Sequence, residues 1–139
     1  MTLTELYQAQ ILDHNRAPHN HFELSDATHS ARGLDALCGD DMRIWLKVEN
    51  GAIERASWSG EACAITTASA SMLTDWLAGR RPAEVRAAEG RFRSLLADED
   101  APDDPGLGDF NALRAVGKFP SRVRNALLPW KAALEALAG

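Results

Sequence analysis

The clearest pattern in the chain is the alternation over residues 42–49, in which Met42, Ile44, Leu46 and Val48 alternate with Arg43, Trp45, Lys47 and Glu49. A period of two predicts a β-strand with one buried face. Asn50-Gly51 follows, and both residue types tolerate the positive φ of a tight hairpin turn. We therefore expect residues 52–59 to return as an antiparallel strand, after which Gly60 ends the sheet. A weaker strand over residues 28–34 gives a small sheet of about three strands.

Two segments carry apolar residues at helical spacing. Residues 4–15 predict a helix that Thr4 caps and that Pro18 stops. Residues 65–77 predict a second helix, because their apolar side chains form one stripe at a period of 3.6. Gly79 follows this stripe and suits the left-handed position just beyond a helix.

The next segment begins with Pro82, which fits the first turn of a short helix. Residues 91–96 continue the helical pattern. Residues 98–106 are rich in aspartate and proline, which predicts a solvated acidic loop.

The C-terminal part predicts two further helices. Asp109 is expected to cap a short one that ends near Val116. The last begins near Pro120 and extends to about Leu137. Pro129 lies inside it and is expected to kink or split it.

Composition limits the class of protein. The chain has 139 residues, 45% of them hydrophobic and 25% charged, which indicates one globular domain over residues 1–139. A net charge of −5 without a basic stripe argues against nucleic acid as a partner. Neither a membrane-spanning apolar run nor a signal peptide is visible, so we expect a cytoplasmic protein that does not enter the membrane.

The chemistry-bearing residues gather at the two ends of the predicted hairpin. Cys38-Gly39-Asp40 precedes it, and Cys63 follows it at the start of the small-residue helix. An antiparallel pair returns the chain to where it began, so these side chains should lie near one another. Two thiolates and a carboxylate suit zinc or iron. Cysteine is also a common small buried residue, and spacing alone leaves that interpretation open.

Longer motifs decide how these residues are interpreted. The chain resembles the U-type iron–sulfur cluster assembly scaffolds (the SufU, IscU and NifU N-terminal-domain group), and the SufU branch most closely. The resemblance covers nearly the whole sequence. It rests on Leu6-Tyr7, Ile11-Leu12-Asp13-His14, Cys38-Gly39-Asp40, Gly60-Glu61-Ala62-Cys63, Ala68-Ser69-Ala70-Ser71-Met72, Leu107-Gly108-Asp109, Lys118-Phe119-Pro120 and Trp130-Lys131.

The resemblance implies a fold, a site and partners. The fold is α+β, with a small antiparallel sheet covered by helices. The metal site consists of three cysteines and an aspartate, for which this chain offers Cys38, Asp40 and Cys63. The implied cofactor is zinc or a [2Fe–2S] cluster, weakly held or absent here. The implied partners are a SufS-like cysteine desulfurase and cluster-acceptor proteins. In the SufU branch the position of Cys38 accepts the sulfur.

Asn125 departs from the family pattern, because it stands where the third cysteine is expected. A neutral amide oxygen is a poor substitute for a thiolate at zinc or iron, and it cannot carry a persulfide. Three functions stay open: a scaffold with a depleted ligand set, a zinc-modulated persulfide acceptor that builds no cluster, and a non-catalytic protein that binds the desulfurase.

Five other polar residues are candidates for lesser roles. His14 is expected to be a polar residue of the core or of the helix end. His19, His21 and His29 lie in a loop-rich region, either as solvated side chains or as a replacement ligand. Arg124 flanks Asn125 and is a candidate to pair with Asp40 or to stabilise the Cys38 thiolate. Its alternative role is on the charged face of an amphipathic helix.

Overall fold

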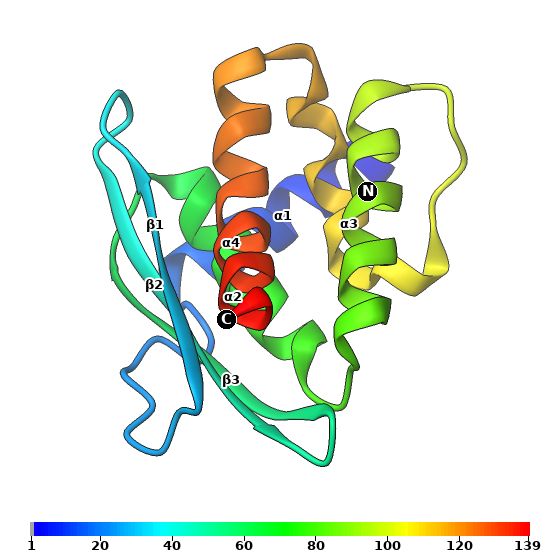
Figure 1. Ribbon diagram of the computed structural model, residues 1–139. Helices are drawn as coiled ribbons and strands as arrows, with labels where there is room; N and C mark the ends of the chain where they lie inside the picture. Colours follow the sequence, from blue (N-terminus) through cyan, green and yellow to red (C-terminus); the bar gives the residue numbers. More distant parts are fainter. Residues whose placement is uncertain (1) are drawn as a thin grey trace.

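A computed structural model describes residues 2–139 and shows a three-stranded antiparallel sheet with the helices packed against one of its faces (Figure 1). The strand order is β1-β2-β3. In chain order the elements are α1 Leu3–Arg16, β1 His29–Asp35, β2 Asp40–Glu49, β3 Ala52–Glu61, α2 Ala64–Leu77, α3 Pro82–Ala97, the 3₁₀ segment η1 Pro105–Lys118, and α4 Pro120–Ala138. The predicted α+β class and the three strands are confirmed.

The β2–β3 hairpin forms as the sequence indicates. Asn50 and Gly51 have φ values of 53° and 76°, which the turn requires. Pairing extends to Asp41 opposite Glu61, so the expectation that Gly60 ends the sheet is wrong. Gly60 has φ of 102°, and a Cβ there would lie 2.3 Å from the carbonyl oxygen of Asp41. Glycine is therefore required within the strand.

The buried face of the sheet is covered by α2 and α4. Met42, Ile44 and Leu46 of β2 are almost fully buried, as the alternating pattern predicts. Trp58 of β3 lies beside them, opposite Ile44. Behind the sheet, Trp130 of α4 packs against the rings of three further aromatic residues, namely Trp76, Phe92 and Phe110.

The helices begin and end close to the predicted residues, but the predicted capping residue of α1 is wrong. The helix α1 ends at Arg16, before Pro18, but its capping side chain is Thr2 rather than Thr4. A threonine oxygen caps from the position just outside the helix, and α1 begins at Leu3, one residue before the predicted start. The helix α2 ends at Leu77, and Gly79 adopts φ of 86°, as predicted.

The segment after α3 also differs from expectation at its cap. The side chain of Asp104, not that of Asp109, caps η1 by accepting a hydrogen bond from Gly106 N–H. The preceding acidic loop is not merely solvated, because Asp104 and Asp103 pair with Arg91 and Arg114.

Pro129 does not split α4, which runs without interruption from Pro120 to Ala138. A proline removes one helical N–H and pushes on the carbonyl group four residues before it. Here two hydroxyl groups of α2 approach the turn of α4 that precedes Pro129. The Ser69 hydroxyl donates to the carbonyl of Ala126 at 2.6 Å, and the Thr66 hydroxyl lies 3.3 Å from the carbonyl of Asn125. Both hydroxyl groups therefore lie beside carbonyl groups of the helical turn that precedes Pro129.

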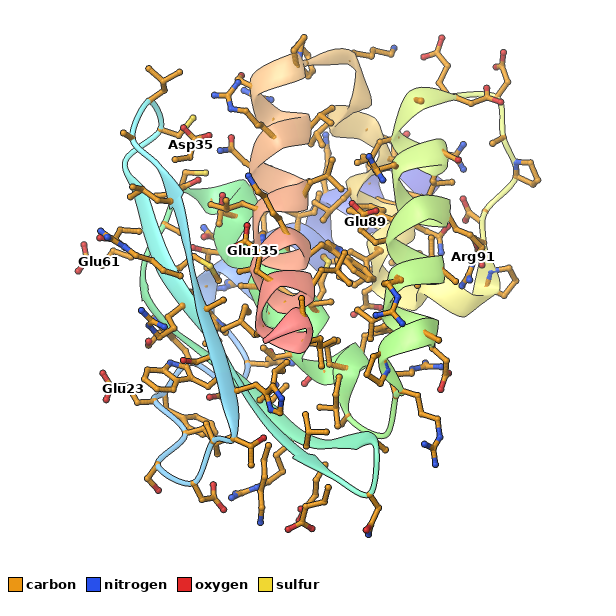
Figure 2. All side chains as sticks on the ribbon, viewed as in Figure 1. Glu23, Asp35, Glu61, Glu89, Arg91 and Glu135 are labelled. Atoms are coloured by element: carbon orange, nitrogen blue, oxygen red, sulfur yellow. The ribbon has the colours of Figure 1, made fainter. Side chains whose placement is uncertain are left out.

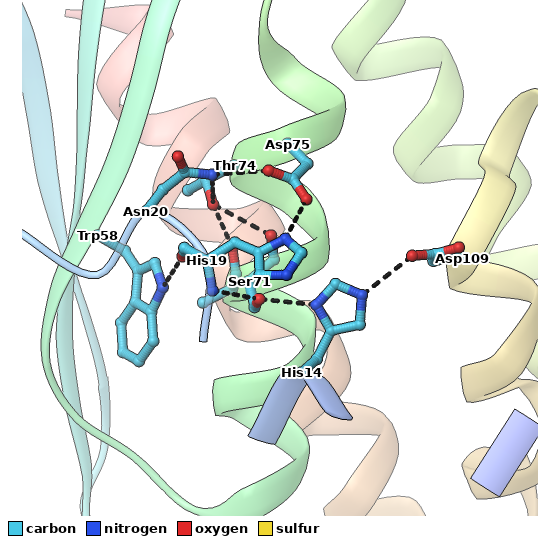
Figure 3. Close-up of polar contacts among 9 residues, drawn as sticks. His14, His19, Asn20, Trp58, Ser71, Thr74, Asp75 and Asp109 are labelled. Atoms are coloured by element: carbon cyan, nitrogen blue, oxygen red, sulfur yellow. Dashed lines mark hydrogen bonds and ion pairs between the residues drawn. The ribbon is translucent and has the colours of Figure 1, made fainter. Parts of the chain in front are cut away.

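A buried polar junction joins α1 to α2 and η1 (Figure 3). His14 is only 5% exposed; its Nδ1 lies 2.7 Å from Ser71 Oγ and its Nε2 lies 3.0 Å from Asp109 Oδ2. The same Ser71 Oγ accepts a hydrogen bond from the backbone N–H of His19. The expectation that His14 is a polar residue of the core is confirmed.

Within residues 2–139, no helix combines the length and the apolar character needed to cross a bilayer.

We expect Ser71→Ala to lower the free energy of unfolding by about 1–3 kcal/mol, because it leaves the His19 N–H and a buried ring nitrogen of His14 without their partner. Urea unfolding measures this change. Ser94→Ala is the matched control, since Ser94 is exposed on α3 and bonds only within its own helix. Equal stability of the two variants would contradict a structural role for the junction.

Candidate functional site

Four segments converge at one end of the sheet. Cys38 lies in the turn between β1 and β2, and Asp40 is the first residue of β2. Cys63 is the N-cap residue of α2, directly after β3. Asn125 lies on α4. The antiparallel hairpin brings the start of β2 beside the end of β3, which places the cysteine-bearing segments together.

Asp40 is the centre of this cluster. Its carboxylate is completely buried, and both oxygens accept hydrogen bonds. Oδ1 accepts from the backbone N–H of Cys63 at 2.7 Å. Oδ2 accepts from the Thr66 hydroxyl at 2.6 Å and from Asn125 Nδ2 at 3.0 Å. Because a buried carboxylate is stable only when it is well paired, these three donors fix its position.

The two cysteines have different surroundings. Cys63 Sγ lies 3.7 Å from Asp40 Oδ2 and 3.3 Å from Thr66 Oγ1, so it is held within the buried network. Cys38 Sγ lies 3.8 Å from Asn125 Oδ1 and 3.8 Å from Arg124 Nη2. Both residues are half-buried and form no disulfide. Cys38 is thus the thiol that faces a cation.

Arg124 pairs with Asp35 rather than with Asp40, so that part of the expectation is wrong. Its Nε donates to Asp35 Oδ2 at 2.9 Å. Asp35 is the last residue of β1 (Figure 2). Its side chain is only 9% exposed, whereas Asp40 already has three donors. The hydrogen bond from Arg124 holds the pKa of Asp35 below its ordinary value of 3.8. The alternative that Arg124 lies beside the Cys38 sulfur agrees with the structure.

The loop histidines make their contacts elsewhere. His19 Nδ1 lies 2.5 Å from Asp75 (Figure 3), and the His21 ring stacks on Trp58 with the ring centroids 3.9 Å apart. His29 contacts the hydroxyl of Thr28. The hypothesis that one of them replaces the missing ligand is therefore not supported by their contacts.

The donor set does not fit a resident zinc ion. In the described residues 2–139, no three histidine, cysteine, aspartate or glutamate side chains are grouped closely enough to hold a metal ion. A structural zinc site requires four converging donors, mostly thiolate or imidazole. Here the Asp40 oxygens are taken by protein donors, and the side chain of Asn125 lies between Asp40 and Cys38.

Comparisons with known proteins place this arrangement in a family. The model of the NifU-like N-terminal domain matches residues 6–126, a range that includes every residue of the cluster. The chain belongs to this family. It is 33% identical to the iron–sulfur cluster assembly scaffold protein IscU of Streptococcus pyogenes serotype M1, covering 97% of this chain and 84% of that protein. It is 34% identical to the zinc-dependent sulfurtransferase SufU of Bacillus subtilis (strain 168), covering 98% and 92%.

Solved structures agree on the fold. A crystal structure described only as that of a hypothetical protein superposes with a TM-score of 0.90 at 32% identity, covering 99% of this chain and 100% of the other. A SUF-system scaffold-like protein from Fervidobacterium islandicum AW-1 superposes with a TM-score of 0.85 at 24% identity, covering 98% and 99%. The α+β architecture predicted from the resemblance is therefore the one that these solved structures have.

Sequence reasoning missed Thr66 and Asp35. Thr66 stands three residues after the N-cap Cys63, where a side chain on the first turn of a helix faces back toward the cap. That spacing is a usable signal. Asp35 had no such signal, because its partner Arg124 is far away in the sequence.

We expect Asn125→Cys to increase zinc retention, because a third thiolate then replaces the amide beside Asp40 and Cys38. Zinc is measured by elemental analysis after dialysis against a chelator. Ser94→Cys is the control, since it adds a thiol on the exposed face of α3. If the two variants retain equal zinc, position 125 does not border a competent metal site.

We expect the pair of Asp35 and Arg124 to make stability depend on acid pH. Because the pKa of Asp35 is lowered in the folded state, its contribution is present above its ordinary value of 3.8 and is lost as pH falls further. Asp35→Asn should flatten the fall in unfolding free energy below about pH 4. Glu23→Gln, at an exposed position (Figure 2), should keep the wild-type pH profile.

Proposed function

We propose that this protein takes part in iron–sulfur cluster assembly as a sulfur acceptor, with Cys38 receiving sulfur from a cysteine desulfurase. One observation carries the assignment to Cys38. Its sulfur lies beside the Arg124 guanidinium on a turn, whereas Cys63 is held by Asp40 and Thr66. The relatives named as a scaffold and as a sulfurtransferase support the wider role.

The transfer is an exchange between the Cys38 thiolate and a persulfide, by the same chemistry as thiol–disulfide exchange. The Cys38 thiolate attacks the outer sulfur of the desulfurase's cysteine persulfide. A new S–S bond forms at Cys38, and the S–S bond of the donor breaks. The donor cysteine leaves as a thiolate, and no external oxidant or reductant is used. Arg124 lies where its positive charge stabilises an anionic Cys38 sulfur.

Exposed apolar side chains around Cys38 support docking of a protein donor. Leu37, the residue before it, is 88% exposed. Leu34, near the end of β1, is 54% exposed. Large apolar side chains on a surface are typical of a protein-binding patch. We propose that the desulfurase binds here and that the reaction takes place in the cytoplasm, where thiols stay reduced.

A second candidate is a scaffold that carries the cluster as cargo. The relative named IscU favours it, and Cys38, Asp40 and Cys63 would be the protein's own contribution to cargo binding. Asn125 argues against it, because the cargo would lack a thiolate at that position. A third candidate, a desulfurase-binding protein without chemistry, does not account for the retention of both cysteines and Asp40.

We expect a desulfurase supplied with L-cysteine to add one sulfur atom to the tryptic peptide 33–43, which contains Cys38, and not to peptide 56–80, which contains Cys63. Mass spectrometry distinguishes the two. Cys38→Ser should abolish the transfer, while Cys63→Ser should retain it.

Persulfide on the Cys63 peptide, or no persulfide on either, would overturn the proposed acceptor. A stable visible absorbance after reconstitution of the wild type with iron and sulfide would favour the scaffold instead.

A further inference from the structure

The side chain of Asn125 uses both of its polar ends inside the site. It is 4% exposed, so neither end is satisfied by bulk water. Its Nδ2 donates to Asp40 Oδ2 at 3.0 Å, and its Oδ1 accepts from the Cys38 thiol at 3.8 Å. The reverse orientation of the amide would turn its oxygen toward a carboxylate, so the contacts also fix which end is which.

The two hydrogen bonds of Asn125 form a bridge between Asp40 and Cys38, and this bridge joins elements that are distant in the sequence. Asn125 ties α4 to the first residue of β2 and to the turn before it. Asp40 ties the same point to α2 through Cys63 N–H and the Thr66 hydroxyl. A metal ion bound by ligands from the same segments would make the same set of cross-connections.

The buried charge explains why the bridge matters. Asp40 is fully buried, and removing one of its three donors leaves part of a carboxylate unpaired. Asn125 cannot be replaced there by an apolar side chain of similar size without that loss. The site is therefore complete as a hydrogen-bonded unit made only of protein groups.

We propose that Asn125 is a positioning residue that holds the Cys38 turn in place and closes the site without a metal ion. Cys38 is thereby held half-buried against Asn125 and Arg124 in the metal-free protein. The role of Cys38 as acceptor rests on the proposed function, but the position of its thiol does not. The two ideas are tested by different measurements.

The experiment measures how fast iodoacetamide alkylates each cysteine in the full chain, without desulfurase. The two cysteines lie on separate tryptic peptides, so one mass-spectrometric run gives both rates and their ratio. The variants are Asn125→Leu, which keeps the branched shape of the side chain but removes both hydrogen bonds, and Asn125→Ala, which removes them without adding bulk. Every variant is measured with and without a strong chelator.

Asn111→Leu is the matched control. Asn111 is also a buried asparagine, 6% exposed, and its side chain bonds to the backbone of Asp104 and Gly108 away from the cysteines. It should lose stability as the Asn125 variants do. A purely structural effect would appear in all three variants alike.

We expect the Cys38-to-Cys63 alkylation ratio to rise by about threefold to tenfold in both Asn125 variants, because Cys38 loses the acceptor that holds it half-buried. In Asn111→Leu the ratio should stay at the wild-type value. The chelator should change neither the melting temperature nor the ratio of the wild type.

An unchanged or lower ratio in the Asn125 variants, or the same rise in Asn111→Leu, would overturn the positioning role. A wild type that melts earlier in chelator would overturn the metal-free closure. Neither outcome depends on whether Cys38 accepts sulfur. Failure of the desulfurase to label Cys38 would in turn leave the alkylation result standing.

Discussion

The buried carboxylate of Asp40 is the constraint on which the rest of the site depends. A charged group with no exposure must be surrounded by donors, and here these come from the backbone at Cys63, from Thr66 on α2 and from Asn125 on α4. To satisfy one side chain, the protein has to bring the end of β3, two helices and the start of β2 to a single point. The positions of both cysteines follow from that convergence.

The packing of α4 against α2 also holds the segments of the site together. Pro129 weakens the helical bonding of the carbonyl groups near Asn125, and hydroxyl groups of α2 approach them from outside the helix. The small side chains of α2 let the two helices approach closely enough for these contacts. Because Thr66 contacts both Asp40 and the backbone of Asn125, the site and the helix interface are one structure.

The side chain at position 125 determines how the groups of the site are connected. A thiolate there would add an anionic donor aimed at the same space as Cys38 and Asp40. The amide at this position donates to the carboxylate and accepts from the thiol, so these three side chains form a closed hydrogen-bonded network. With Asn125 in this place, the chain superposes on a solved structure with a TM-score of 0.90.

The sequence alone determined the β2–β3 hairpin, the extent of α2 and the approach of the two cysteine segments, because these follow from period, turn residues and antiparallel geometry within one local stretch. Only the tertiary structure decided that Arg124 pairs with Asp35, that Asp104 rather than Asp109 caps η1, and that Asn125 bridges Asp40 and Cys38. The contacts of Arg124 and Asn125 depend on which donors and acceptors meet once distant segments have packed, and no local sequence pattern determines that.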